Sequence, residues 1–299
     1  TSLPQCEIVF AAGVDVDSDD GSRIAAACAL SADAEVIVLC LGESADMSGE
    51  AACRATPGLP GRQRELAESA LATGVPVVVI LFSGRPLMIT WLVERARAVV
   101  CAWFLGNMAG QAIADVLTGR FNPTARLPIS WPREIGQIPI FYSSRPTGRP
   151  ADAADPFTSK YLDLSVEPLF PFGHGLSFSR VELTNLRLNR TEFHVQDWIK
   201  VEVDVINRGG VATEETIFLF VHDVVSTVAR PLVELKAWAK VELDPGQTKL
   251  VAFPLAAESF RVLDENFKSV LELGDFDIFV GLNADRKSLL KVSLRALAS

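Results

Sequence analysis

The sequence is poor in the side chains that most often bind metals or cross-link a chain. Its 299 residues include only three histidines and five cysteines. His174, His194 and His222 lie far apart and give little support to a histidine-based metal site. The cysteines are odd in number, form no CxxC pair and lie partly in apolar runs, which favours buried free thiols over disulfides or zinc. They are Cys6, Cys28, Cys40, Cys53 and Cys101.

Positive charge and long apolar runs are also scarce. The 28 Lys and Arg residues are outnumbered by 37 Asp and Glu residues, and the formal charge of −9 argues against a nucleic-acid partner. No apolar run reaches the roughly 20 residues that a membrane span needs. We find no signal peptide, no Gly-x-Ser-x-Gly nucleophile elbow and no phosphate-binding loop. With 49% apolar and 22% charged residues, the sequence predicts a globular protein with a substantial core.

Short apolar runs alternate with amphipathic stretches in the first half of the chain. The runs predict buried strands, and the stretches between them, which end at glycine, predict helices. We expect strands over 34–42, 76–84 and 98–103 and helices over 60–74 and 109–117. This alternation predicts an α/β sandwich with a mostly parallel sheet and helices on both faces. Residues 7–12 predict a further strand, so we expect the chain to begin partway through something larger.

The second half has a different rhythm. Between 120 and 180, frequent prolines predict an extended connection. Beyond it no stretch predicts a helix, and short strands are expected over 198–206, 216–221, 237–243, 249–255 and 276–281. Such spacing is typical of an all-β immunoglobulin-like or fibronectin type III-like sandwich. We therefore expect an α/β sandwich domain over 1–142, an extended linker over 143–180 and a fibronectin type III-like domain over 181–299.

Three strand ends of the α/β half lead into polar or irregular loops. These loops cover 42–54, 83–86 and 104–108. Ligands of parallel sheets bind beyond the carboxyl ends of the strands, and we expect the three loops to converge on one rim of the sheet.

The first of these loops carries three carboxylates, Glu43, Asp46 and Glu50. A metal site, an acid/base site and an ordinary solvated loop are the alternatives, although the spacing does not match a calcium loop. Two carboxylates are the minimal set for cleaving a glycosidic bond. Glu50 is the better proton-donor candidate, because Glu43 directly follows the strand and is placed to organise the loop. Taken alone, the loop favours the solvated alternative.

Several motifs, taken together and in order, resemble the C-terminal part of glycoside hydrolase family 3, including its bacterial periplasmic β-glucosidases. The resemblance covers essentially the whole chain. It is carried by GESADMSGEAACR, LPGRQRELAESALATGVPVVVILFSGRPL, AWFLGNMAGQAIADVLTGRFNPTARLPISWPREIGQIPIFY, TGRP, SKYLDL and LFPFGHGLSFSRVEL. The later RPLVELKAWAKVELDPGQTKLVAFPL is similar to the fibronectin-like domain that closes those enzymes.

The resemblance implies a division of the active site. In the family a (β/α)8 barrel precedes the α/β sandwich and bears the nucleophilic aspartate, and no residue of this chain matches it. The family's proton donor is in many members a glutamate within Gly-Glu-Gly-x-Asp-Arg. Here Glu50 and Arg54 keep that spacing, while Ala51 and Cys53 replace the second glycine and the aspartate. Glu50 is therefore the implied general acid/base.

The implied activity is that of a retaining β-glucosidase acting on terminal non-reducing β-D-glucosyl residues. Met47, Ser48, Arg54 and Tyr161 are the expected substrate contacts. We expect no cofactor, no metal, no nucleic acid and no membrane, but a β-glucoside or oligosaccharide substrate and the barrel as partners. A homodimer, a periplasmic or secreted location and inactivity of the isolated chain are further expectations. A β-xylosidase, another exo-β-glycosidase of the family and a non-catalytic carbohydrate-binding module remain alternatives.

Overall fold

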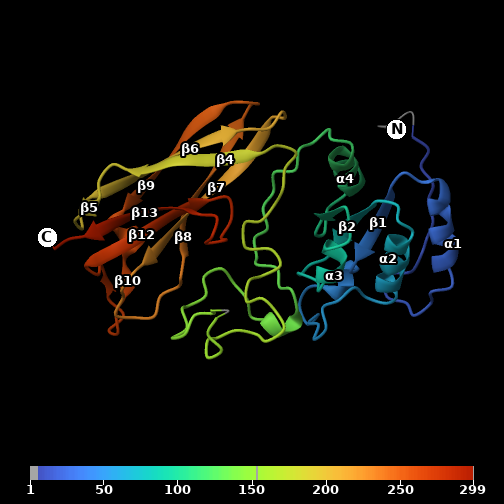
Figure 1. The fold of residues 1–299 in the computed structure, drawn as a ribbon, viewed down its shortest axis with the longest axis horizontal. Helices are drawn as coiled ribbons and strands as arrows, with labels where there is room; N and C mark the ends of the chain where they lie inside the picture. The colour runs from blue at the N-terminus through green and yellow to red at the C-terminus, as the bar shows by residue number, and fades with distance from the viewer. Residues whose placement is uncertain (1–5, 153, 299) are drawn as a thin grey trace. The chain divides into compact units, whose positions relative to one another are not determined.

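A computed structural model describes residues 6–152 and 154–298 (Figure 1). The described chain forms two compact units. The first contains the residues up to Phe121 together with Trp131–Ile138, and the second contains Asn122–Ser130 and the residues from Pro139 onward. The domain limits expected at 142/143 and 180/181 stay a prediction.

The first unit is built on a parallel sheet with the strand order β1-β2-β3. The strands are β1 (Ile37–Gly42), β2 (Val77–Phe82) and β3 (Ala98–Cys101). β2 pairs in parallel with both neighbours, so that Leu39 lies opposite Val79 and Ile80 opposite Val100. Because it is covered on both edges, β2 is the most deeply buried of the three strands. The predicted parallel sheet is confirmed.

The helices of the first unit agree with the sequence where they are long. In the described part they are α1 (Ile24–Ala29), α2 (Gln63–Ala72), α3 (Thr90–Val93) and α4 (Ala109–Leu117), with 3-10 turns η1 (Leu30–Asp33), η2 (Ala45–Met47) and η3 (Ile135–Gln137). α2 and α4 confirm the predicted helices, and the glycines that follow them, Gly74 and Gly119, have φ of +81° and +72°. α2 packs against β1, and α1 packs against α2 (Figure 1). The short α1 and α3 escape prediction because a few residues show no helical period.

The strand expected over residues 7–12 is wrong. In the described part of the chain, no strand pairs with this segment. Its apolar side chains Ile8, Val9 and Phe10 are 76%, 61% and 86% exposed. An extended segment without a neighbour has no ladder for its backbone groups, so an apolar sequence alone does not make it a strand.

The second unit is a β-sandwich, as predicted. One sheet has the strand order β5-β13-β12-β7-β8, the other has the order β4-β6-β9, and β10 pairs with β11. The strands are β4 (Val181–Leu188), β5 (Glu192–Phe193), β6 (Trp198–Asn207), β7 (Thr213–Asp223), β8 (Glu234–Leu243), β9 (Thr248–Ala256), β10 (Val262–Leu263), β11 (Ser269–Val270), β12 (Gly274–Gly281) and β13 (Leu290–Ala296), with a 3-10 turn η4 (Ala257–Phe260).

The core of the sandwich follows the period-2 pattern of the sequence. Alternate residues of β6 are fully buried, namely Ile199, Val201, Val203 and Val205. They belong to one apolar cluster with side chains of β7, β9 and β12 from both sheets. The sequence prediction omits β4, whose alternation is interrupted by an irregularity between Thr184 and Arg187. It also omits β13, although apolar and polar residues alternate there.

The segment Asn122–Ser130 belongs to the second unit and is joined to it by polar contacts. Arg126 and Glu215 form an ion pair whose side chains are only 7% and 3% exposed. Arg126 Nε donates to Glu215 Oε1 at 2.8 Å, and Nη2 donates to Oε2. Asn122 also donates to the carbonyl of Ala212 at 3.0 Å. A bidentate pair of this kind fixes the segment against β7.

The cysteines correct one expectation. All of them are free, but Cys6, Cys40 and Cys53 are exposed rather than buried. Cys40 is exposed on β1 between the buried residues Leu39 and Leu41, so its side chain lies on the opposite face of the strand from theirs. Cys101 is partly buried, and burial raises the pKa of its thiol to about 11, so that it stays protonated at neutral pH. Within the described residues, none of the helices has the length and apolar character needed to cross a bilayer.

Candidate active site

The three strand-end loops of the first unit meet at one rim, as predicted. Their meeting point is Gly84 in the loop after β2. A Cβ atom added there would lie 1.9 Å from Ser48 Oγ in the loop after β1 and 3.1 Å from Phe104 in the loop after β3. The glycine is required because any side chain would displace its neighbours.

The end of β1 is held by a side chain that the sequence analysis did not single out. Gln63, the first residue of α2, accepts a hydrogen bond from the Gly42 N–H at 2.7 Å and donates to the Gly42 carbonyl at 2.7 Å. It also donates to the carbonyl of Val16. Gly42 has φ of +135°, and a Cβ there would lie 1.8 Å from the carbonyl oxygen of Phe82. The start of the carboxylate loop is thus fixed by a glycine and a buried amide.

Glu43 is the buried acid of this loop. Its side chain is 0% exposed, and Arg54 Nη1 donates to Oε1 at 2.8 Å. Arg85 Nε and the Ser83 hydroxyl lie 3.3 Å and 2.9 Å from Oε2. Burial alone would raise the pKa of Glu43, but hydrogen bonds from Arg54 and Ser83 and the charge of Arg85 outweigh it and lower that pKa. Glu43 is therefore a charged anchor, in agreement with the prediction that it organises the loop.

Arg85 connects this anchor to the outer part of the loop. Its Nη2 donates to the carbonyl of Met47 and, at 2.8 Å, to the carbonyl of Ala52. These two carbonyls bracket the segment 48–51, which contains Glu50. Because one guanidinium reaches the buried carboxylate and both ends of the segment, it fixes the loop across its width.

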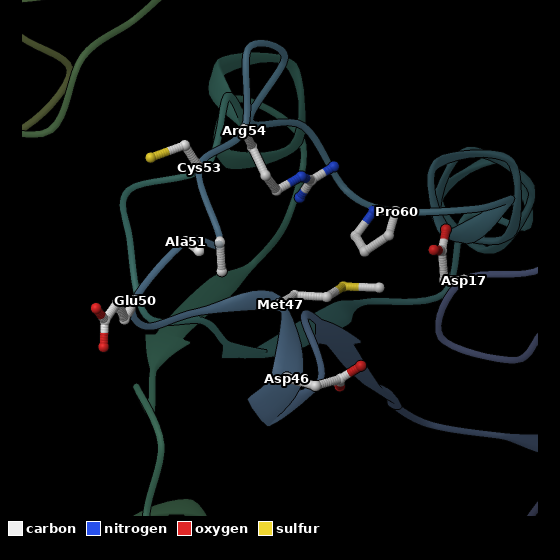
Figure 2. Close-up of a pocket in the computed structure, with 9 residues that line it drawn as sticks. Asp17, Asp46, Met47, Glu50, Ala51, Cys53, Arg54 and Pro60 are labelled. Atoms are coloured by element: carbon white, nitrogen blue, oxygen red, sulfur yellow. The ribbon is translucent and has the colours of Figure 1, made fainter.

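Glu50 itself is exposed. Among the described residues, its carboxylate forms no hydrogen bond or ion pair. Its two neighbours have unusual backbones, with φ of +134° at Gly49 and +60° at Ala51. Ala51 occupies the place of the second glycine in the family's pattern, and its left-handed backbone gives that glycine a physical reason. Figure 2 shows the Glu50 carboxylate pointing away from the side chains of Met47 and Arg54.

The loop borders an open hollow of about 370 Å³ (Figure 2). Its lining residues are Asp17, Asp46, Met47, Glu50, Ala51, Ala52, Cys53, Arg54 and Pro60. Met47 and Arg54 thus lie at the hollow, whereas the hydroxyl of Ser48 lies against Gly84. Arg54 pairs with Glu43 and not with Glu50. A hydrogen bond from Ser44 lowers the pKa of Asp46, which is therefore a carboxylate at neutral pH.

A second hollow of about 360 Å³ adjoins the first and shares Asp17, Arg54 and Pro60 with it. It is further lined by Thr56, Gly58, Leu59, Gly61, Arg64, Met88 and Trp91. Carboxylates and guanidinium groups beside an aromatic ring are suited to bind a neutral ligand rich in hydroxyl groups. In 6–152 and 154–298, no three His, Cys, Asp or Glu side chains come together in a group that could hold a metal ion.

Tyr161, the remaining expected substrate contact, lies in the second unit. Its side chain is exposed, in a stretch without helix or strand. Its expected role therefore stays a prediction.

Comparison with known proteins places this pairing of a parallel α/β unit and a β-sandwich among the glycoside hydrolases. The description "Glycosyl hydrolase family 3 C-terminal domain" matches residues 8–178, and "Fibronectin type III-like domain" matches residues 215–284. The chain belongs to glycoside hydrolase family 3.

Relatives with curated names are longer enzymes. A periplasmic beta-glucosidase of Salmonella typhimurium is 38% identical over 255 residues, which are 85% of this chain and 33% of that protein. A beta-xylosidase of Formosa agariphila is 35% identical over 288 residues, 96% of this chain and 39% of that protein. The crystal structure of a beta-glucosidase from Listeria innocua in complex with glucose aligns with a TM-score of 0.90 and 35% identity, over 95% of this chain and 39% of that one. The chain thus spans between 33% and 39% of these proteins.

Proposed function

We propose that this chain is the acid/base-bearing portion of a retaining β-glucosidase, with Glu50 as the proton donor. The observation that carries the proposal is the held loop: an exposed glutamate lies at a strand end beside a polar hollow, on a segment braced by Glu43 and Arg85. Membership of glycoside hydrolase family 3 and relatives named beta-glucosidase support the substrate class.

The mechanism needs a second carboxylate, which we assign to a (β/α)8 barrel outside this chain. The barrel aspartate attacks the anomeric carbon while the Glu50 carboxyl protonates the departing oxygen, and Glu50 then takes a proton from the water that releases the sugar. In retaining enzymes the two carboxyl groups lie about 5–5.5 Å apart. An outward-pointing Glu50 does not conflict with this role, since catalytic contacts often form only when substrate is bound.

The remaining assignments belong to the same proposal. Met47, Ser48, Arg54 and Tyr161 contact the sugar or its leaving group. The substrate is a β-glucoside or an oligosaccharide, and the whole protein is periplasmic or secreted and can form a homodimer. The α/β sandwich domain extends over 1–142, the linker over 143–180 and the fibronectin-like domain over 181–299.

Complementation tests the division of the active site. The 299-residue chain, a separately produced barrel fragment and their mixture are assayed with an aryl β-glucoside. We expect turnover only in the mixture and in the joined polypeptide, because each part supplies one carboxylate. Turnover by the chain alone would contradict the proposed division of the active site.

A β-xylosidase is the second candidate, because a relative of that name aligns over 96% of the chain. The two substrates differ by the hydroxymethyl group on C5. Comparison of kcat/KM for the aryl glucoside and the aryl xyloside in the joined polypeptide decides between them. A higher kcat/KM for the aryl glucoside favours the glucosidase, and a higher kcat/KM for the aryl xyloside favours the xylosidase.

A further inference from the structure

We propose that Arg85 is the positioning residue of the general acid. It holds the segment 48–51 at both ends and thereby limits where the Glu50 carboxyl can lie. This inference rests on the proposed function and adds to it a residue on a different strand-end loop.

The geometry carries this inference in three contacts. Arg85 donates to the carbonyls of Met47 and Ala52 with the same nitrogen, Nη2. Its Nε lies 3.3 Å from the Glu43 carboxylate. Its side chain is only 20% exposed, so water competes poorly for these hydrogen bonds.

Among the described residues, the backbone hydrogen bonds near the segment 48–51 are long, and one of them runs from the Ser48 N–H to the Ala45 carbonyl at 3.4 Å. The Ala52 N–H donates to the Gly49 carbonyl at a long 3.3 Å, and Ala51 has a strained backbone with φ of +60°. Glycine at position 49 adds conformational freedom next to Glu50. Without Arg85 the turn would sample several conformations, and the proton donor would spend little time within reach of the leaving oxygen. A misplacement of about 1 Å can reduce a rate by roughly 100-fold.

Replacing Arg85 by lysine distinguishes an effect on the position of Glu50 from an effect on protein stability. Arg85→Lys keeps a positive charge that can pair with Glu43. An ammonium group that pairs with Glu43 cannot also reach the carbonyls of Met47 and Ala52, because it has one nitrogen where Arg85 uses Nε for the carboxylate and Nη2 for the carbonyls. We therefore expect Arg85→Lys to recover most of the thermal stability that Arg85→Ala loses, but little of the lost activity.

The kinetic test uses the joined polypeptide and two β-glucosides, one with an alkyl leaving group and one with an activated aryl group. For Arg85→Ala and Arg85→Lys we expect kcat/KM to fall roughly 10- to 100-fold on the alkyl glucoside and less than about 3-fold on the aryl glucoside. Arg120→Ala is the control, because Arg120 is exposed and pairs only loosely with Asp115, at 3.9 Å. Equal losses on both substrates, or full recovery of activity in Arg85→Lys, would overturn the inference.

A structural measurement on the 299-residue chain gives an independent result. A glutamyl endopeptidase cuts after Glu50 only when the loop opens, and the cut is identified by mass spectrometry. We expect Arg85→Ala to be cut about tenfold faster than the wild type and Arg120→Ala at the wild-type rate. An unchanged rate in Arg85→Ala would overturn the inference. If Glu50→Ala lowers kcat/KM equally on both glucosides, Glu50 is not the proton donor and the proposed function fails. The positioning role of Arg85 is then overturned as well, even if Arg85→Ala is cut faster by the protease.

Discussion

Each compact unit contains a buried carboxylate that is held by arginine, Glu43 in the first unit and Glu215 in the second. Glu43 is 0% exposed and Glu215 is 3% exposed. Arg126 donates to Glu215 through Nε and Nη2, and its Nη1 is buried without a hydrogen-bond partner in the described chain. The arginines that pair with Glu43 also donate to backbone carbonyls, Arg85 to those of Met47 and Ala52 and Arg54 to that of Gly58. The same kind of ion pair thus fixes a connecting segment in one unit and braces a candidate catalytic loop in the other.

Breaking the ion pair between Arg126 and Glu215 is expected to have the largest effect on stability. Arg126→Met leaves the Glu215 carboxylate buried without its counter-charge, and we expect the free energy of unfolding of the second unit to fall by about 3–5 kcal/mol. Urea-induced unfolding followed by tryptophan fluorescence measures this loss. Arg187→Ala, which removes an exposed arginine from Glu202, should have a much smaller effect. Equal losses in the two variants would show that burial does not set the strength of the pair.

Gln63→Leu disturbs the carboxylate loop of the first unit, because Gln63 holds Gly42 at the start of that loop. The Gly42 N–H and carbonyl would both lose a buried partner, and we expect the free energy of unfolding of the first unit to fall by about 2–4 kcal/mol. Gln111→Leu is the matched control, because the Gln111 amide is exposed and donates to Asp115 on its own helix. The same urea titration reports both variants, and a loss of equal size in the control would contradict this role of Gln63.

Ala51→Gly sharpens the comparison, because it tests the left-handed backbone of the candidate catalytic loop, where Ala51 has φ of +60°. We expect the free energy of unfolding to rise by about 0.5 kcal/mol, since relief of the left-handed strain is partly offset by the larger entropy of glycine in the unfolded chain. Ala114→Gly, in the middle of α4, should lower it by about 1 kcal/mol. Thermal unfolding of both variants measures the sign of the change in the free energy of unfolding. A lower stability of Ala51→Gly would contradict the inference that the Ala51 backbone is strained.

The pH dependence of stability tests the charge of Glu43. Its pKa is lower in the folded than in the unfolded chain, so its contribution is present above the ordinary glutamate pKa of about 4.3 and is lost as the pH falls through the folded value. Glu43→Gln removes this contribution. We expect the melting temperature of the variant to fall less steeply than that of the wild type as the pH is lowered from 5 towards about 3. Parallel curves would mean that Glu43 carries no linked stability.

The sequence predicted the elements of this fold where a periodic pattern is long enough. The continuous apolar runs predicted β1 to β3, and the alternation over 198–206 predicted β6. The pattern failed over residues 7–12, because a strand needs a neighbour as well as an apolar sequence.

The acids of the candidate loop can be recognised in the sequence, whereas the side chains that support the loop cannot. Glu43 and Glu50 stand out by charge and by their place after β1. The role of Arg85 depends on contacts across two loops, which spacing along the chain does not encode. Gln63 left a weak signal, since it is a polar residue on the buried face of α2 that also includes Leu66, Ala67 and Ala70.

The central claim is that Glu50 donates the proton. The most direct test is the effect of Glu50→Ala on kcat/KM for an alkyl and an activated aryl β-glucoside, with Asp46→Ala as the control on the same loop. We expect Glu50→Ala to lower hydrolysis of the alkyl glucoside by roughly 10²- to 10⁴-fold and that of the aryl glucoside far less, because a good leaving group needs little protonation. Equal losses on both glucosides, or the same selectivity in Asp46→Ala, would contradict the account.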